Sequence, residues 1–512
     1  MNAATALLAP TLDAGRGDDP ALLFGDEVIT YADLDARSDA FAHACADLGV
    51  GRGDRVLMMI SDRPEFFVVY LGTMKAGAVA VALNLRMSAA DVLYSLEDSA
   101  CRLFVVDPQF LDVYAEAASR LDRPPVVLTS QPVPGHRSID QVTRRHDTPF
   151  DAVSMDPGDM AFWMYTSGTT GPPKGAIHRH GSALAGDRFL ARVLGVGPGD
   201  RLFATSKLFF AFSLGHCFFG ALGLGATTIL LDAWPTPEAA AEVVARHRPT
   251  IMLSVPTMFR NMLEAGVTDG EGFRQVRTYV SAGEKLPPAL AARWQAVTGA
   301  PIVEGIGATE TGFLFLANRA DEQRAESCGR PLPETEFTLR DEAGAPVETP
   351  GAPGIGWVRT DCLADGYWGQ PEKTVAAFHD GWYCTGDMFT RDDDGWYYHQ
   401  GRADDMLKVS GQWVAPAEIE DIVMADDRVG DAAVVSVSDR DGLACLAMFI
   451  VAPETDAERL ETDLRAALLE RLAVYKCPRR VYMVDDMPRT STGKVRRFVL
   501  REMAAALVSD PA

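Results

Sequence analysis

A polar segment in the first half of the chain, Thr166 to Gly175, has the composition of an anion-binding loop. It reads TSGTTGPPKG and combines three glycines, four hydroxyl side chains and a lysine. The glycines let backbone N–H groups turn toward an anion, the hydroxyls add donors, and Lys174 adds a mobile positive charge. Pro173 and Gly175 occupy positions that the common phosphate loop GxxxxGK[ST] gives to glycine and to Ser or Thr. The segment therefore predicts a different kind of triphosphate loop, the alternative being a polar surface loop.

Five later segments also place glycines beside polar or charged side chains. In chain order they are SAGE (281–284), EGIGATETG (304–312), GWYCTGDM (381–388), GRADDMLKVSGQW (401–413) and PRTSTGKVRR (488–497). A carboxylate such as Asp387 can accept hydrogen bonds from two hydroxyl groups, although an Asx turn is the alternative for this residue. A glycine such as Gly411 lets a thin ligand pass close to the backbone.

The six segments, in this order, resemble the motifs of the adenylate-forming superfamily of acyl-CoA synthetases, peptide-synthetase adenylation domains and firefly-type luciferases. The resemblance extends from about Thr30 to Arg497. It implies that a carboxylate first attacks ATP to give acyl-AMP and pyrophosphate, with Mg²⁺ offsetting phosphate charge, and that a thiol, that of coenzyme A, then takes the acyl group.

The resemblance implies an ATP site in which Thr309 contacts phosphate, Glu310 holds magnesium and Asp387 binds both ribose hydroxyls. Ile306 departs from the pattern, because many members have a tyrosine there that stacks on adenine. The full implied set is Thr166, Ser167, Gly168, Thr169, Thr170, Gly171, Lys174, Ser281, Gly283, Glu284, Gly305, Ile306, Gly307, Thr309, Glu310, Asp387, Arg402 and Lys494.

Lys494 corresponds to the catalytic lysine of the family, which lies between the acyl carboxylate and the α-phosphate during adenylation. Glu310 and Thr166 complete the implied catalytic set, and the alternative for Lys494 is a solvated charge in a basic tail. Asp404 would be a hinge about which a small C-terminal domain turns between the two steps. The implied coenzyme A contacts are Lys408, Gly411 and Trp413, and candidates for its phosphates are Arg86, Arg479 and Arg480.

The acyl site implied by the resemblance is apolar and aromatic. Within KLFFAFSLGH (207–216), Ala211 and Phe212 would face the substrate, and no aspartate is present to hold the amino group of an amino acid. KLFFAF and GIGATE are most similar to the benzoate-CoA ligase branch, which favours an aromatic acid. The remaining implied acyl-site residues are Ser281, Gly283, Gly305, Gly307 and Phe313.

Three alternatives to an aryl-CoA ligase remain open. A short- or medium-chain fatty acyl-CoA synthetase could use the same apolar slot, and a stand-alone adenylation enzyme would load a carrier protein instead of coenzyme A. The third is a binding module without enzymatic activity, for which the match of Lys494, Glu310 and Asp387 would be a coincidence. Separately, the alternative for each aromatic residue of the acyl site is a place in the core.

Elements that could position these groups alternate along the chain as helices and apolar strands. The pattern predicts a capped helix from Thr30, a strand at 55–60, a helix at 64–77 and a strand at 78–83, which is typical of a doubly wound sheet. The same pattern recurs at 237–255 and 287–304, while short strands separated by turns follow Pro331. We expect an α/β fold: an N-terminal domain (1–402) of two doubly wound sheets plus a β-barrel-like subdomain, and a small, mobile α+β domain (403–512).

Bulk composition excludes several kinds of partner. The chain has 512 residues and a formal net charge of −23, whereas nucleic acids and anionic membranes require a basic face. The eight cysteines form no CxxC pair, which favours a reducing compartment. The apolar run 208–231 contains four glycines and ends in TTILL, which favours a buried helix or loop leading into a strand. We expect a soluble, cytoplasmic monomer or homodimer.

Overall fold

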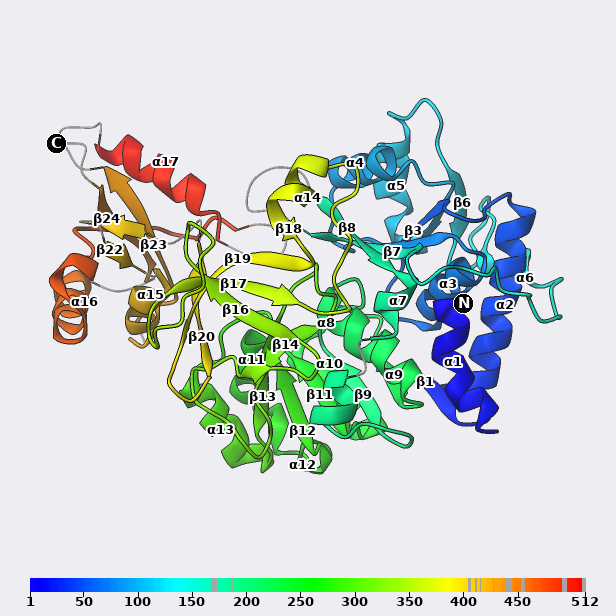
Figure 1. Cartoon of the computed structure of the whole chain (residues 1–512), viewed down its shortest axis with the longest axis horizontal. Coiled ribbons are helices and arrows are strands. Elements are labelled where there is room, and N and C mark those ends of the chain that lie inside the picture. The colour runs from blue at the N-terminus through cyan, green and yellow to red at the C-terminus, as the bar shows by residue number, and fades with distance from the viewer. Residues whose placement is uncertain are drawn as a thin grey trace. The chain divides into compact units, whose positions relative to one another are not determined.

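The computed structural model describes residues 1–166, 173–185, 188–403, 407–409, 412–414, 416–426, 428–438, 444–452, 456–489 and 495–508 (Figure 1). The chain divides into two compact units. The first unit contains Met1–Phe337, Trp357–Cys384 and Asp394–Tyr397, and the second contains Thr338–Gly356, Thr385–Asp393 and Tyr398–Ala512. Each unit consists of several separate stretches of the chain, so the expected division at 402/403 stays a prediction.

A six-stranded sheet in the first unit carries the predicted phosphate loop at one edge. Its strands, in spatial order, are β6 (Val126–Thr129), β5 (Leu103–Val106), β3 (Arg55–Met59), β4 (Val79–Ala82), β7 (Met160–Thr166) and β8 (Lys174–Arg179). All neighbours are parallel except β7 and β8. Runs such as LFVV and VAVA are buried throughout, as expected for parallel strands that are covered on both faces.

A nine-stranded sheet forms the other half of this unit. Its spatial order is β15 (Arg330–Pro331), β14 (Leu314–Ala317), β13 (Ile302–Gly307), β12 (Thr278–Ser281), β11 (Ile251–Ser254), β9 (Arg201–Ala204), β10 (Thr227–Leu230), β1 (Pro20–Phe24) and β2 (Glu27–Thr30). The six strands from β13 to β1 are parallel. The predicted pair of doubly wound sheets is confirmed.

Helices cover both faces of both sheets. One hydrophobic cluster joins the inner faces of the two sheets through α1 (Ala3–Asp13), α2 (Tyr31–Asp47), α3 (Pro64–Lys75) and the π-helix η3 (Leu214–Gly220). Helix α2 begins as predicted at Thr30, whose side chain forms a capping box with Asp33. The outer faces are covered by α4 (Ala89–Ser99) and α5 (Leu111–Ala118), and by α10 (Pro237–His247), α11 (Pro256–Glu264), α12 (Glu271–Gln275) and α13 (Pro288–Thr298) (Figure 1).

The apolar run 208–231 is buried and does not form one continuous helix. It consists of α8 (Ala211–Ser213), η3, α9 (Ala221–Gly223) and β10. In the described part of the chain, no helix combines the length and the apolar character needed to cross a membrane. The other short helices are η1 (Pro108–Phe110), α6 (Ile139–Thr143), α7 (His180–Ala183), η2 (Phe189–Val193), η4 (Val267–Asp269) and η5 (Val474–Lys476).

The β region expected after Pro331 forms a separate five-stranded sheet. Its strands are β16 (Glu336–Arg340), β17 (Gly354–Arg359), β19 (Trp382–Arg391), β18 (Phe378–His379) and β20 (Tyr397–Arg402), and α14 (Pro371–Ala377) precedes β18. The chain passes from one unit to the other within β16, β17, β19 and β20.

The C-terminal part has the α+β architecture predicted for it. Strands β23 (Asp431–Ser438), β24 (Ala444–Val451) and β25 (Arg480–Met483) form one sheet, and β21 (Leu407–Val409) pairs with β22 (Gln412–Val414). Helices α15 (Pro416–Met424) and α16 (Ala457–Arg471) pack in one cluster with this sheet. Helix α17 (Arg497–Val508) packs in another through Leu500 and Ala504.

The close packing of η3 generates a stability prediction. A Cβ atom at Gly215 would lie 2.5 Å from the carbonyl oxygen of Gly312 and 2.8 Å from the Phe313 ring. Gly215→Ala should therefore lower the free energy of unfolding by about 1–3 kcal/mol through overpacking, measured by denaturant titration. Gly223→Ala is the matched control, because its Cβ would meet only Leu7 at an ordinary 3.5 Å. Equal stability of the two variants would contradict the packing argument.

Candidate functional site

The turn between β13 and β14, residues 308–313, is the centre of the candidate site. Thr311 closes it, because its hydroxyl accepts a hydrogen bond from Ala308 N–H (3.1 Å) and donates one to the Phe313 carbonyl (2.7 Å). Gly312 has φ +67°, a conformation that favours glycine. A Cβ at Gly307 would lie 2.6 Å from the Phe313 carbonyl oxygen, so hairpin packing requires this glycine whether or not a ligand is bound. We call residues 308–313 the β13–β14 turn.

Strand β8 and the segment before α14 hold the β13–β14 turn in place. Nε2 of the buried His178 lies 2.9 Å from the Thr309 carbonyl oxygen. Burial lowers the pKa of His178 to about 4, so the imidazole is neutral near pH 7, and a bond to this carbonyl requires the tautomer with its hydrogen on Nε2. The Ala364 N–H donates to the Glu310 carbonyl at 2.8 Å. The two predicted ligand residues Thr309 and Glu310 are thus fixed through their backbones.

Glu310 is 7% exposed, and its carboxylate accepts a hydrogen bond from the Tyr367 hydroxyl at 2.7 Å. The Nζ atom of Lys174 lies 4.6 Å from the centroid of the same tyrosine ring, a cation–π distance. Tyr367 therefore joins the lysine of the predicted phosphate loop to the predicted magnesium ligand. The sequence analysis missed Tyr367, whose only local signal is the DGYW string at 365–368.

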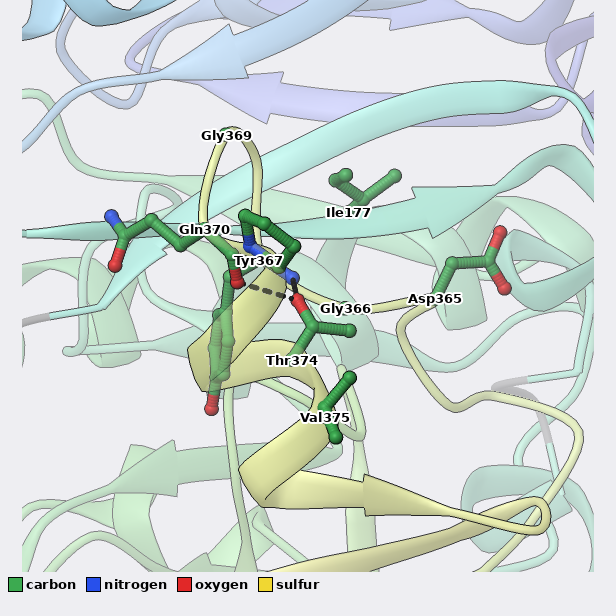
Figure 2. Close-up of a pocket in the computed structure, with 9 residues that line it drawn as sticks. Ile177, Asp365, Gly366, Tyr367, Gly369, Gln370, Thr374 and Val375 are labelled. Atoms are coloured by element: carbon green, nitrogen blue, oxygen red, sulfur yellow. Dashed lines mark hydrogen bonds between the residues drawn. The ribbon is translucent and has the colours of Figure 1, made fainter.

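Figure 2 shows Tyr367 at the rim of a surface pocket between the 365–370 segment and α14. Its backbone N–H donates to the Thr374 hydroxyl (2.9 Å), which donates in turn to the Gln370 carbonyl (3.0 Å). The pocket is mainly apolar, and none of its lining residues belongs to the predicted ATP or acyl sites. The pocket therefore lies outside the predicted binding sites, and the bond to Thr374 helps to fix the Tyr367 backbone.

The ends of the predicted phosphate loop are held as expected at the carboxyl end of a buried strand. Thr166, the last residue of β7, pairs with Lys174, the first residue of β8. The Tyr94 hydroxyl donates to the Pro173 carbonyl at 3.1 Å, and the Trp368 N–H donates to the Gly175 carbonyl at 2.8 Å. The loop residues Ser167, Gly168, Thr169, Thr170 and Gly171 lie outside the described residues.

Two of the predicted acyl-site residues lie beside one buried histidine. His216 lies 5.8 Å from Phe212 and 5.9 Å from Phe313 between ring centroids. Ala211 and Phe212 are half-buried in the short helix α8, and Ser281 is fully buried at the end of β12. These aromatic side chains form an apolar region that includes Phe313, which lies on the same β13–β14 turn as Glu310.

Lys207 anchors the start of the KLFFAFSLGH segment. Its ammonium donates to the carbonyls of Leu231 (2.5 Å) and Ala233 (2.6 Å) and lies 3.7 Å from the Asp62 carboxylate. Burial lowers the pKa of Lys207 and raises that of Asp62 to about 6. These contacts engage the ammonium and give Lys207 a structural role.

Two glutamates flank the predicted adenine segment. The carboxylate of Glu284 accepts hydrogen bonds from the N–H (3.0 Å) and the hydroxyl (2.7 Å) of Thr257, at the start of α11. Glu304, which the sequence analysis did not select, accepts from Leu286 N–H at 3.0 Å, and burial raises its pKa to about 7. Gly283 has φ +86° in the turn after β12, and Gly305 and Ile306 lie within β13 beside Glu304.

Asp387 and Arg402, both in the second unit, lie side by side. Nη1 of Arg402 donates to the Thr385 carbonyl at 2.7 Å and lies 3.3 Å from Oδ1 of Asp387. His399 also approaches Asp387, at 3.5 Å. Gly386, the residue before Asp387, has φ +70°, and a Cβ there would lie 2.6 Å from the Arg402 guanidinium. The carboxylate that is predicted to bind the ribose therefore has a positively charged side chain, that of Arg402, as its neighbour.

Two of the predicted coenzyme A residues lie on paired strands, because Lys408 of β21 pairs with Trp413 of β22. Gly411, the hinge candidate Asp404 and the catalytic candidate Lys494 lie outside the described residues. Arg86, a candidate for the coenzyme A phosphates, stacks 3.6 Å over the Trp234 ring. The described part of the chain contains no cluster of three His, Cys, Asp or Glu side chains of the kind that holds a metal.

Comparison with known protein families identifies two matching models. The AMP-binding enzyme model matches residues 12–368, and the AMP-binding enzyme C-terminal domain model matches residues 418–494. The first match covers the phosphate loop, the β13–β14 turn and the acyl-site residues. The second ends at Lys494.

Relatives and solved structures match over nearly the whole chain. A 3-hydroxybenzoate–CoA ligase of Aromatoleum sp. (strain CIB) is 48% identical over 99% of this chain and 97% of its own. A 3-hydroxybenzoate–CoA/4-hydroxybenzoate–CoA ligase of Thauera aromatica is 45% identical over 99% and 98%. The crystal structure of the anthranilate CoA ligase AuaEII with anthranoyl-AMP superimposes with a TM-score of 0.89 at 32% identity, covering 100% of this chain and 98% of that one. The chain therefore belongs to the adenylate-forming family of AMP-binding enzymes.

Proposed function

We propose that this protein is an AMP-forming aryl-CoA ligase that activates a benzoate-type acid and transfers it to coenzyme A. The observation that carries the proposal is the aromatic region formed by Phe212, His216 and Phe313, of which Phe313 lies on the β13–β14 turn that also holds Glu310. A flat ring fits such a lining, and the reacting carboxylate would then lie on the Glu310 side. The hydroxybenzoate–CoA ligases at 45–48% identity support the same substrate class.

In the first step, a carboxylate oxygen of the acid forms a bond to the α-phosphorus of ATP, and the bond to the pyrophosphate oxygen breaks. Lys174 and the loop that begins at Thr166 would hold the departing β- and γ-phosphates. Lys494 would reduce the repulsion between the two anions and follow the charge into the transition state. Asp387 and Arg402 would bind the ribose.

Glu310 is suited to the role of a magnesium ligand. Mg²⁺ binds through one or two carboxylates, with water and substrate phosphates completing its coordination, so one buried carboxylate suffices. The hydrogen bond from Tyr367 leaves acceptor capacity on the carboxylate, because an ionised carboxylate accepts about four hydrogen bonds. When bound, the ion would supply positive charge that offsets the phosphates.

In the second step, the thiol sulfur forms a bond to the acyl carbon, the acyl–phosphate C–O bond breaks, and AMP leaves while the thiol proton is released. Lys408, Gly411 and Trp413 would contact the pantetheine arm. The small C-terminal domain (403–512) would turn about Asp404 between the steps, which removes Lys494 from the reacting atoms.

The proposal is tested with a panel of carboxylic acids, incubated with ATP, Mg²⁺ and coenzyme A and scored for AMP release and thioester mass. Benzoates should give the highest kcat/KM. Higher values for linear acids would support a fatty acyl-CoA synthetase instead. Acyl-AMP formation without any transfer to coenzyme A would support loading of a carrier protein.

The Lys494 assignment predicts a separation of the two steps. Lys494→Ala should lower ATP–pyrophosphate exchange by at least about 100-fold, while thioester formation from supplied aryl-AMP stays near the wild-type rate. Lys476→Ala is the control, because Lys476 is also in the second unit but forms an ion pair with Glu418 at 2.6 Å. Equal losses in both half-reactions would contradict the assignment.

The link between Tyr367 and Glu310 predicts a defect in the first step. Tyr367→Phe removes one hydrogen bond to a buried carboxylate, so ATP–pyrophosphate exchange should fall by about 5- to 30-fold. Tyr279→Phe is the matched control, since it loses a buried hydroxyl bond to the Phe273 carbonyl (2.5 Å) on the outer face of the sheet. The Tyr367 role is wrong if both variants keep the wild-type exchange rate.

A further inference from the structure

His216 is a fully buried imidazole whose two ring nitrogens have no hydrogen-bond partner among the described residues. Three aromatic rings surround it, with centroid distances of 5.3 Å to Phe189, 5.8 Å to Phe212 and 5.9 Å to Phe313. Phe212 and Phe313 are two of the residues proposed to line the acyl site. A polar group without a partner therefore lies beside the place proposed for the substrate ring.

The backbone holds His216 firmly at this place. The residue is in η3, a seven-residue π-helix, and such helices occur frequently at functional sites. The neighbouring Gly215 lies against the Gly312 carbonyl and the Phe313 ring, closer than any other residue type allows. This packing fixes the imidazole relative to the β13–β14 turn, which carries Glu310.

A role in the core alone does not explain a histidine here. A buried donor or acceptor without a partner costs about 1–3 kcal/mol, and a phenylalanine of similar size would fill the same aromatic space without that cost. The cost is removed if a ligand supplies the partner. Sites built in this way reject analogues that lack the bonding group, because the protein group is then left unpaired.

We propose that His216 is a specificity-determining residue that hydrogen-bonds a hydroxyl group on the ring of the aromatic acid. The proposal rests on the proposed function and adds to it the residue that distinguishes hydroxybenzoates from benzoate. The ring would pack between Phe212 and Phe313, with its hydroxyl directed at the imidazole.

The charge state of the imidazole limits the substituent. Burial lowers the pKa of His216 to about 3, so the ring is neutral at working pH, with one nitrogen as donor and the other as acceptor. A neutral imidazole suits an uncharged O–H group, which donates to one nitrogen or accepts from the other. It offers no positive charge to a second carboxylate on the ring.

The test compares kcat/KM for benzoate, the 3- and 4-hydroxybenzoates and the matching fluorobenzoates, in the wild type and in His216→Phe. The wild type should prefer its better hydroxybenzoate over both benzoate and the matching fluorobenzoate. His216→Phe should lower this preference by about 10- to 100-fold. His216→Asn, which keeps a donor and an acceptor, should retain part of it and also serves if the phenylalanine variant does not fold.

Tyr70→Phe is the matched control. The Tyr70 hydroxyl is also buried without a partner, but its ring contacts Phe66, Phe162, Phe218 and Phe219 and none of the proposed acyl-site residues. This variant should leave the preference unchanged. Equal losses for all acids in His216→Phe, or a wild type that uses hydroxybenzoate and fluorobenzoate equally well, would overturn the inference. A wild type that activates only non-aromatic acids would instead overturn the proposed function.

Discussion

The β13–β14 turn, residues 308–313, is the constraint on which the candidate site depends. It must hold an acidic side chain in a buried position, and four contacts from three parts of the first unit, namely β8, the segment before α14 and η3, fix it there. His178 bonds the Thr309 carbonyl, Ala364 bonds the Glu310 carbonyl, Tyr367 bonds the Glu310 carboxylate, and Gly215 packs against Gly312. Without these contacts, the buried carboxylate would lack the partners that burial requires.

The same turn joins two chemical environments. On one side, Glu310 accepts a hydrogen bond from Tyr367, and the ring of Tyr367 contacts Lys174 at the end of the predicted phosphate loop. On the other side, Phe313 continues the turn into the aromatic region of Phe212 and His216. This arrangement suits the proposed reaction of an apolar acid with a phosphate, because both reactants would be positioned by a single segment.

Sequence reasoning predicted the regular elements well and the links between them poorly. The strands of both sheets appear as apolar runs such as VAVA and IMLS, and the start of α2 is indicated by its N-cap residue Thr30. The motifs also located Lys174, Glu310 and Phe313. Tyr367 and His178 were missed because their roles arise from pairing between segments far apart in the chain. The π-helical form of LGHCFFG was not predictable either, since an apolar run carries no signal of its helical period.

The central claim is that one turn carries both the phosphate-side and the aromatic contacts of an aryl-adenylate. The most direct measurement is a crystal structure of the protein with a non-hydrolysable hydroxybenzoyl-AMP analogue. The account predicts that the aryl ring packs against Phe212 and Phe313 while the phosphate group lies beside Thr309. An analogue bound with its ring away from these two phenylalanines would contradict it.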